Sequence, residues 1–263
     1  DAIAPRLDRL RPPSVANTRL VAPPWPAQER AEFRRNDPGA PTMRAIEADA
    51  PMPTLASSPQ PGLTFVDLRP AINYPVNSTG MLFDDPLGYL ATVPLGVQQY
   101  LGTPFDIRGV VVMSMTPGPG LPQVGPHSSP VPSPVAHFTT LHVLLSGCCL
   151  LQGRRRAPVA EVVIDYADGS AARVPILYHQ HLWEPWGDPG DAIPARVAWV
   201  EPPPRAMVNF ESPYRIYSAR LANPHPQRAV STLAFEATDK PWSGPLILAV
   251  TVEAAPPQAI ARR

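Results

Sequence analysis

Glu161-Val-Val-Ile-Asp-Tyr-Ala-Asp-Gly-Ser-Ala-Ala-Arg-Val-Pro-Ile-Leu177 is the stretch with the clearest structural signal in this chain. Two runs rich in β-branched residues meet at Asp168-Gly169. The pair Asp-Gly readily adopts the positive φ angles of a tight hairpin turn, so it fixes the register of the flanking strands. The stretch predicts an antiparallel β-hairpin.

Short β-type runs separated by turn residues continue on both sides of this hairpin. This pattern is typical of a sandwich or barrel. We expect an all-β fold, a β-sandwich whose ten candidate strands fill two packed sheets. The candidates are Leu63–Leu68, Gly96–Tyr100, Asp106–Met115, Phe138–Leu151, Ala160–Tyr166, Ala171–Tyr178, Arg196–Val200, Tyr214–Leu221, Val230–Glu236 and Leu246–Glu253.

The composition excludes several classes of protein. Proline makes up 39 of 263 residues, which is too frequent for long helices. The 22 basic and 22 acidic residues balance, so the chain lacks the positive field that holds nucleic acid. The longest apolar run, residues 142–151, is far shorter than the ~20 residues of a membrane helix. Because the sequence begins at Asp1 rather than Met, we expect a processed, exported protein that is periplasmic or extracellular.

Residues 1–61 differ from the rest of the chain and are called the N-terminal arm. The arm holds twelve prolines and one glycine, a composition that favours a stiff, extended chain. Its scattered apolar residues are too sparse for a core, but they suit docking on another subunit or on the arm's own domain. The residues expected to make these contacts are Leu20, Trp25, Phe33, Arg34 and Arg35. Residues 62–256 are expected to form the sandwich, and residues 257–263 a short tail.

Several blocks between residues 63 and 253 occur in a consistent order. They include Phe83-Asp-Asp-Pro-Leu-Gly-Tyr-Leu90, Val93-Pro-Leu-Gly-Val-Gln-Gln-Tyr-Leu-Gly-Thr-Pro-Phe-Asp-Ile-Arg-Gly-Val110, Leu141-His-Val-Leu144, Tyr166-Ala-Asp-Gly169, Leu221-Ala-Asn-Pro-His-Pro226 and Ala249-Val-Thr-Val-Glu253. Together they resemble bacterial jelly-roll domains of the galactose-binding-like superfamily, which accompany glycosidases and surface proteins. The resemblance implies a jelly roll that binds rather than catalyses.

One core and one corner are expected from these blocks, and a long loop departs from the pattern that they resemble. The side chains of Phe105, Ile107, Val110 and Val112 are expected to fill the core between the two sheets. Asn223-Pro-His-Pro226 is expected to form a rigid corner between strands. Residues 117–134 hold seven prolines, which indicates a long surface loop that is either a binding loop or an insertion.

His179-Gln-His181 is a candidate metal site. On a strand, these two imidazoles would share a face, with Glu184 three residues further on, as in the metal sites of cupin-type jelly rolls. The spacing to Glu184 is short for that pattern, so a hydrogen-bonded or surface histidine pair is the alternative.

Trp183 and Trp186 flank Glu184 and, with Tyr178, form an aromatic and acidic cluster. Such a cluster suits a glycan or a protein partner, and it equally suits a structural cover on the end of the sandwich. These residues and the two histidines are the candidate ligand-binding set.

Asp84 and Asp85 are candidate ligands of a structural Ca²⁺, which jelly rolls of the resembled superfamily often hold in a loop. The same pair is also ordinary turn chemistry. No other cofactor is expected. Neither a Gly-x-Ser-x-Gly elbow nor a phosphate-binding Gly-x-x-x-x-Gly-Lys loop is present, so we do not expect an enzyme.

Two functions remain open at this point. The first is a non-enzymatic accessory or scaffolding subunit that docks on a larger extracytoplasmic or membrane-attached protein assembly through the N-terminal arm and the sandwich loops. The second is a carbohydrate-binding module that recognises a glycan through loop aromatics.

Overall fold

The computed structural model describes residues 55–73, 90, 93–113, 125–148, 156–183, 194–201, 214–238 and 244–256. These residues are all-β and contain no helix, which confirms the expected fold class. Their twelve strands are β1 (Leu63–Phe65), β2 (Gly96–Tyr100), β3 (Thr103–Ile107), β4 (Val111–Val112), β5 (Val131–Pro132), β6 (Phe138–Cys148), β7 (Pro158–Tyr166), β8 (Ala171–Leu177), β9 (Arg196–Glu201), β10 (Tyr214–Ala222), β11 (Val230–Ala237) and β12 (Gly244–Ala254).

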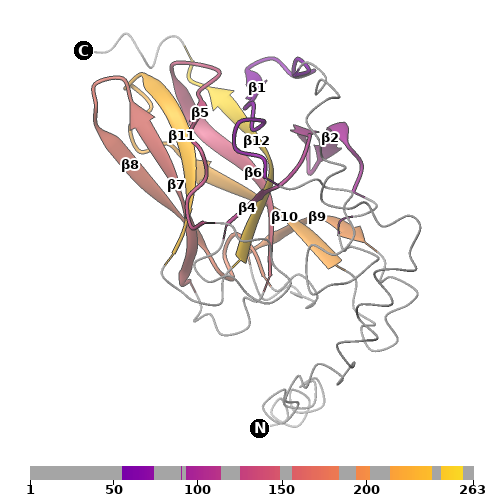
Figure 1. The fold of residues 1–263 in the computed structure, drawn as a ribbon. Coiled ribbons are helices and arrows are strands. Elements are labelled where there is room, and N and C mark those ends of the chain that lie inside the picture. The colour runs from indigo at the N-terminus through magenta and orange to yellow at the C-terminus, as the bar shows by residue number, and fades with distance from the viewer. Residues whose placement is uncertain are drawn as a thin grey trace, which may run out of the picture. The chain divides into compact units, whose positions relative to one another are not determined.

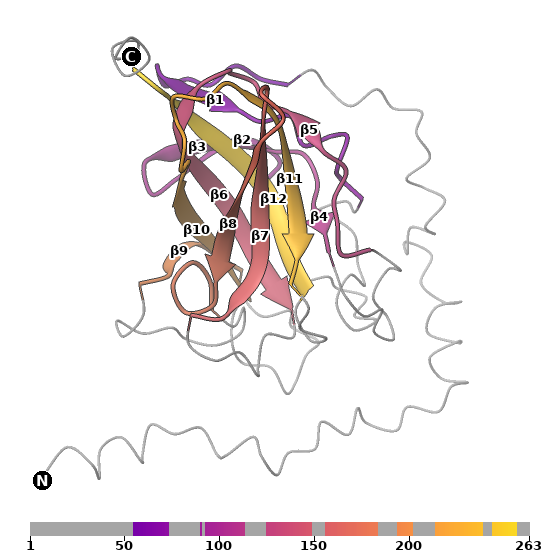
Figure 2. The same cartoon turned by 90° about the vertical axis from the view of Figure 1, so that its left-hand side faces the viewer.

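The strands form three antiparallel sheets. The largest has the order β1-β12-β6-β10-β9, and β4 pairs with the same strand β12 further along. The second has the order β5-β11-β7-β8, and the third is the hairpin β2-β3. Figure 1 shows the four-stranded sheet on one side of the largest sheet and β2 on the opposite side. Figure 2 shows β7, β8 and β11 in front of β6 and β12.

The core between the two larger sheets comes from alternate residues of their strands. Leu141, Tyr217 and Val250 of the largest sheet pack with Ile164 and Phe235 of the four-stranded sheet, and all five are at most 1% exposed. Such alternation is what a strand buried on one face requires, because successive side chains point to opposite faces.

A second core lies on the other face of the largest sheet. Phe105 and Ile107 of β3 pack there against Leu144, Tyr214 and Ile216. This corrects the expectation for Phe105, Ile107, Val110 and Val112, which are all buried, but in this second cluster and not between the two larger sheets. The predicted strand Asp106–Met115 is also divided, because β3 pairs with β2 whereas β4 pairs with β12. As a result, β12 is buried on both faces along residues 244–252.

The predicted hairpin is present as β7 and β8, which pair antiparallel. Its turn differs from the expected one, because only Gly169 has a positive φ, of 82°. The Gly169 amide donates to the Tyr166 carbonyl at 3.0 Å, and the Tyr166 amide donates to the Ser170 carbonyl at 2.8 Å. A three-residue loop, residues 167–169, therefore closes the hairpin, with glycine where the left-handed conformation is needed.

The Asn223-Pro-His-Pro226 corner forms between β10 and β11, as predicted. The Asn223 side chain accepts a hydrogen bond from the Tyr166 hydroxyl at 2.6 Å and donates one to the Phe138 carbonyl at 3.0 Å. It also accepts one from the His225 amide at 3.0 Å. One buried amide thus joins the corner to both larger sheets and satisfies its own polar atoms there.

Residues 125–134 correct the prediction of a long surface loop in this part of the chain. β5 pairs with β11, and the Ser128 amide donates to the Phe235 carbonyl at 2.9 Å. The Phe235 amide donates in turn to the Ser128 hydroxyl at 2.9 Å. The segment therefore lies along the edge of β11. Prolines are tolerated there because an edge strand leaves alternate amides unpaired.

Candidate functional site

The turn after β8 holds the predicted His-x-His pair. β8 ends at Leu177, and the amides of Gln180 and His181 both donate to the Leu177 carbonyl, at 3.3 and 2.9 Å. His179 has a φ of 67°, in the left-handed region. The interpretation of the pair as neighbours on one strand face is therefore wrong, because a turn and not a strand carries them.

Tyr178, His179 and Trp183 come together as one aromatic cluster. The rings of Tyr178 and Trp183 are stacked, with centroids 5.3 Å apart and planes at 1°. The His179 ring lies 3.9 Å from Trp183 and 4.2 Å from Tyr178. Tyr178 is buried, and Trp183 packs against the main core. One ring face of Trp183 is thus occupied by protein, as expected of a tryptophan that covers the end of a sandwich.

His181 is held by the backbone. Its Nδ1 accepts a hydrogen bond from the Leu177 amide at 2.9 Å, and burial lowers the pKa of its imidazole. Both observations favour the neutral ring with Nδ1 as an acceptor. Among the described residues, no group of three or more His, Cys, Asp or Glu side chains is placed to hold a metal ion.

The other predicted site residues lie outside the described residues. These are Glu184 and Trp186 of the ligand-binding set, Asp84 and Asp85 of the calcium pair, and Leu20, Trp25, Phe33, Arg34 and Arg35 of the N-terminal arm. Of the predicted ligand-binding set, the structure therefore places Tyr178, His179, His181 and Trp183.

The β2-β3 hairpin carries a feature that the sequence analysis did not single out. The large apolar side chains with substantial exposure among the described residues are Leu95 at 51%, Val97 at 40%, Leu101 at 45% and Val200 at 46%. Three of these four belong to β2 and its ends. Leu95, Val97, Gln99 and Leu101 alternate along the chain with less exposed neighbours, and we call these four residues the β2 stripe.

The turn of this hairpin is conformationally unusual. Leu101 and Gly102 connect Tyr100 to Thr103, and their φ angles are 52° and 84°. Two consecutive positive φ angles are typical of a type I′ turn, in which Asn and Gly are the preferred residues. Leucine in the left-handed region costs about 1 kcal/mol. An exposed leucine therefore occupies a position where folding favours a small polar residue.

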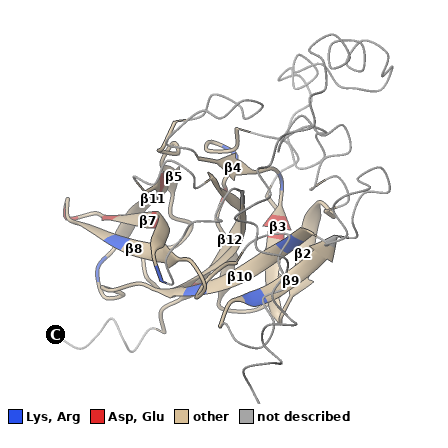
Figure 3. Ribbon diagram, turned by 90° about the horizontal axis from the view of Figure 1, so that it is seen from below, with Lys and Arg blue, Asp and Glu red and all other residues tan. Residues whose placement is uncertain are grey.

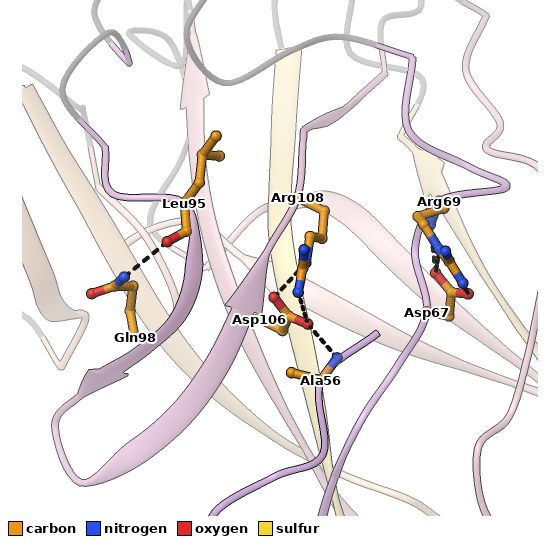
Figure 4. Close-up of polar contacts among 7 residues, drawn as sticks. All are labelled: Ala56, Asp67, Arg69, Leu95, Gln98, Asp106 and Arg108. Carbon is orange, nitrogen blue, oxygen red and sulfur yellow. Dashed lines mark hydrogen bonds and ion pairs between the residues drawn. The ribbon is translucent and has the colours of Figure 1, made fainter. Parts of the chain in front are cut away.

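One Asp-x-Arg pair begins in β3 of the hairpin, and a second follows β1 (Figure 4). The Asp106 carboxylate, 1% exposed, receives the Arg108 guanidinium at 2.6 and 3.0 Å and the Ala56 amide at 3.1 Å. The second pair, Asp67 and Arg69, has side chains about one-third exposed. The bonds from Arg69, followed by the smaller effect of Arg108, hold the pKa of Asp67 below its usual value.

Charged residues outside the hairpin are spread over several strands of the described part, among them β8, β9 and β10 (Figure 3). The apolar stripe and the buried ion pair next to it therefore distinguish the β2-β3 hairpin from the rest of the described surface. Among the described residues, no helix is long and apolar enough to cross a membrane.

The sequence contained a signal for this surface. Leu95-Gly-Val-Gln-Gln-Tyr-Leu101 repeats an apolar or large side chain at every second position, which is the period of one strand face. The pattern indicates one strand face, on which Val97 and Gln99 lie, whereas Leu95 precedes β2 and Leu101 lies in the turn. It does not reveal that this face is the uncovered one, because Phe105 and Ile107 in the next strand have the same period and are buried.

No protein-family model matches the sequence, and no curated protein matches it significantly.

Proposed function

We propose that this chain is a non-enzymatic accessory or scaffolding subunit that docks on a larger protein assembly outside the cytoplasm. The observation that carries the proposal is the β2 stripe, with Leu95, Val97 and Leu101 each 40–51% exposed on one hairpin. The N-terminal arm extends the contact in this proposal.

The energetics of the stripe support a protein partner. Fully burying a Val or Leu side chain contributes ~1.5–3 kcal/mol, so covering these three half-exposed side chains contributes on the order of 3 kcal/mol. The strained backbone of Leu101 adds to the argument, because strain of this kind persists where a contact requires the residue. Among the described residues β2 pairs with β3 alone, and an edge strand of this kind accepts a further strand.

The fold is compatible with the proposal. Two antiparallel sheets that pack face to face around a common core support a galactose-binding-like jelly roll, which the sequence blocks resemble. Fold alone does not decide function, so the proposal rests on the β2 stripe and not on the architecture.

A carbohydrate-binding module is the second candidate, and the stacked Tyr178 and Trp183 support it. In this case a glycan would contact the accessible part of the half-buried Trp183, together with Glu184 and Trp186. We rank it second because Tyr178 is 4% exposed and its ring is committed to packing.

The test compares a double variant with a matched control. Leu95→Ser with Val97→Ser removes two of the three apolar side chains of the stripe, and Val200→Ser removes a comparably exposed valine on β9. Each tagged protein is purified gently from cells that produce it, and the stoichiometry of the co-purified proteins is measured.

We expect one partner set at fixed stoichiometry with the wild type and Val200→Ser, and its loss with the double variant. The reciprocal purification through the partner must recover this chain. Two results contradict the proposal: equal partner recovery from all three proteins, or a free monomer that is retained on a polysaccharide column. The second of these supports the carbohydrate-binding module.

A further inference from the structure

The two-residue turn of the β2-β3 hairpin determines which backbone groups of β2 bond to β3. The turn joins Tyr100 to Thr103, and the closing pair of such a turn is hydrogen-bonded. Bonded and non-bonded pairs alternate along an antiparallel ladder, so the next pair, Gln99 and Pro104, is non-bonded. Pro104 fits this position, because it has no amide hydrogen and its carbonyl accepts a hydrogen bond from the Thr251 hydroxyl of β12 at 2.6 Å.

The backbone groups of Gln99 therefore point away from β3, to the open edge of β2. The same holds for Val97, which lies two residues earlier and opposite Asp106. Each of these two residues presents one N–H and one C=O group. Within the part of the chain that the structure describes, no hydrogen bond reaches these groups. A row of unpaired donors and acceptors is a template for a further strand.

The remaining edge strands of the described part have features that hinder such pairing. On β8, Pro175 has no amide hydrogen, and the Leu177 amide donates to His181 Nδ1. β4 and β5 have two residues each, β1 has three, and the register of β9 against β10 is shifted once. Prolines, short edges and bulges are usual means of preventing edge pairing. β2 has five residues without a proline, a charge or a register shift.

A second copy of β2 matches this edge. The open groups belong to Val97 and Gln99, one residue to either side of Gln98. If two β2 strands pair antiparallel about a two-fold axis at Gln98, Val97 of each copy lies opposite Gln99 of the other. The two pairs are related by the axis, and each exchanges two N–H···O bonds. The pairing therefore satisfies every open group of both strands.

The exposed leucines follow the same symmetry. Leu95 and Leu101 lie three residues to either side of Gln98, Leu95 before β2 and Leu101 in the turn, and they are 51% and 45% exposed. The axis therefore places Leu95 of one copy beside Leu101 of the other, at both ends of the pairing. Identical charges would repel each other across such an axis, but β2 has no charged residue.

We propose that β2 pairs with β2 of a second copy of this chain, and that the chain joins its assembly as this pair. The inference rests on the function proposed above and names the occupant of the β2 edge. The hairpins of the two copies form one sheet in the order β3-β2-β2-β3. A two-fold axis perpendicular to this sheet keeps both β2 stripes on the same face. The assembly then docks on a doubled stripe.

The test needs only the purified full chain. Analytical ultracentrifugation over a wide range of concentration gives the dissociation constant of the pair. Gln99→Pro removes one open amide and takes no bond from the hairpin, because Gln99 and Pro104 are a non-bonded pair. Val200→Ser is the control, since it removes an exposed valine on β9, away from β2.

We expect a dimer at high concentration for the wild type and for Val200→Ser. The dissociation constant of Gln99→Pro should be higher by roughly tenfold or more, because the axis doubles the loss to one N–H···O bond in each of the two pairs. A monomer at all concentrations overturns the proposal, and so does a dimer whose dissociation constant is the same in Gln99→Pro and the wild type.

A disulfide test determines the register and decides the proposal even if Gln99→Pro does not fold. Val97→Cys chains are mixed with Gln99→Cys chains under mild oxidation, and peptide mass spectrometry locates the disulfides. Opposite residues of a bonded pair have Cα atoms roughly 5.5 Å apart, within the range of a disulfide. We expect a disulfide between positions 97 and 99 in the mixture, and several times less cross-linked dimer in either variant alone. Absence of this disulfide overturns the proposal.

The pairing and the proposed function fail in different ways. A monomeric chain whose partner set is lost with Leu95→Ser and Val97→Ser overturns the pairing and leaves the proposed function intact. A dimer with the disulfide between positions 97 and 99 that co-purifies with no partner set supports the pairing of β2 and contradicts the proposed function.

Discussion

The Asp106–Arg108 pair should be the most sensitive polar contact of the hairpin region to substitution. Asp106 is 1% exposed at its side chain and Arg108 is 17% exposed, so Asp106→Asn leaves a largely buried guanidinium without its counter-charge. Removing one partner of a buried ion pair costs ~3–5 kcal/mol. Because Arg108 keeps some contact with water, we expect the lower end, about 3 kcal/mol.

The matched control has the same sequence pattern in a different environment. Asp67 and Arg69 form an Asp-x-Arg pair at 2.6 Å, but their side chains are 31% and 30% exposed. Ion pairs with this degree of exposure contribute ~0–1 kcal/mol. Asp67→Asn should therefore have a small effect, which high salt should reduce further.

The assay is thermal and urea unfolding of the wild type and the two variants. A domain of this size shifts its Tm by roughly 2–4 °C per kcal/mol, so Asp106→Asn should lower the Tm by roughly 6–12 °C. Asp67→Asn should lower it by less than about 4 °C. Equal losses in the two variants, or a loss below about 1 kcal/mol for Asp106→Asn, would refute the argument from burial.

Three further substitutions have expected outcomes. Leu101→Asn should raise stability by about 0.5–1 kcal/mol in urea unfolding, because Asn suits the left-handed turn. The same substitution should weaken partner binding. A loss of stability would contradict the strain argument. Burial lowers the pKa of His181, so the unfolded chain binds more protons than the folded one, and stability should fall as the pH drops below the unfolded pKa of about 6.5. His181→Asn keeps an acceptor for the Leu177 amide and should flatten this dependence of stability on pH, measured from pH 7.5 to 5. Tyr166→Phe removes the 2.6 Å bond to Asn223 and should cost roughly 1–2 kcal/mol, whereas a neutral result would mean that water replaces the hydroxyl.

Strand existence was the most predictable level of the structure. Each of the ten predicted ranges overlaps a strand, and the Asp168-Gly169 hairpin forms, because β-branched runs and turn residues act locally. β5 was not predicted, because it forms through pairing with a distant strand and not through local sequence. Its two residues, Val131 and Pro132, have no periodic pattern, and only the edge of β11 organises them as a strand.

The candidate site was less predictable than the strands. Tyr178 and Trp183 were expected to cluster, and they stack, but the turn that brings them together also moves His179 and His181 off a common strand face. That turn depends on the Leu177 carbonyl accepting two amides, a contact that no spacing rule reveals. The His-x-His spacing alone therefore pointed to the wrong local geometry.

The sequence by itself determined the fold class, the main hairpin and the Asn223 corner, because each depends on backbone preferences within a few residues. Tertiary structure decided which apolar faces are covered. Phe105 and Leu95 have the same strand period, yet Phe105 is fully buried against the largest sheet and Leu95 is half exposed. The burial of a strand face depends on which segment packs against it. For the Phe105 face of β3 that segment is the largest sheet, whose strands β6 and β10 are distant in the chain. The exposed β2 stripe is therefore a property of the assembled sheets and not of the local sequence.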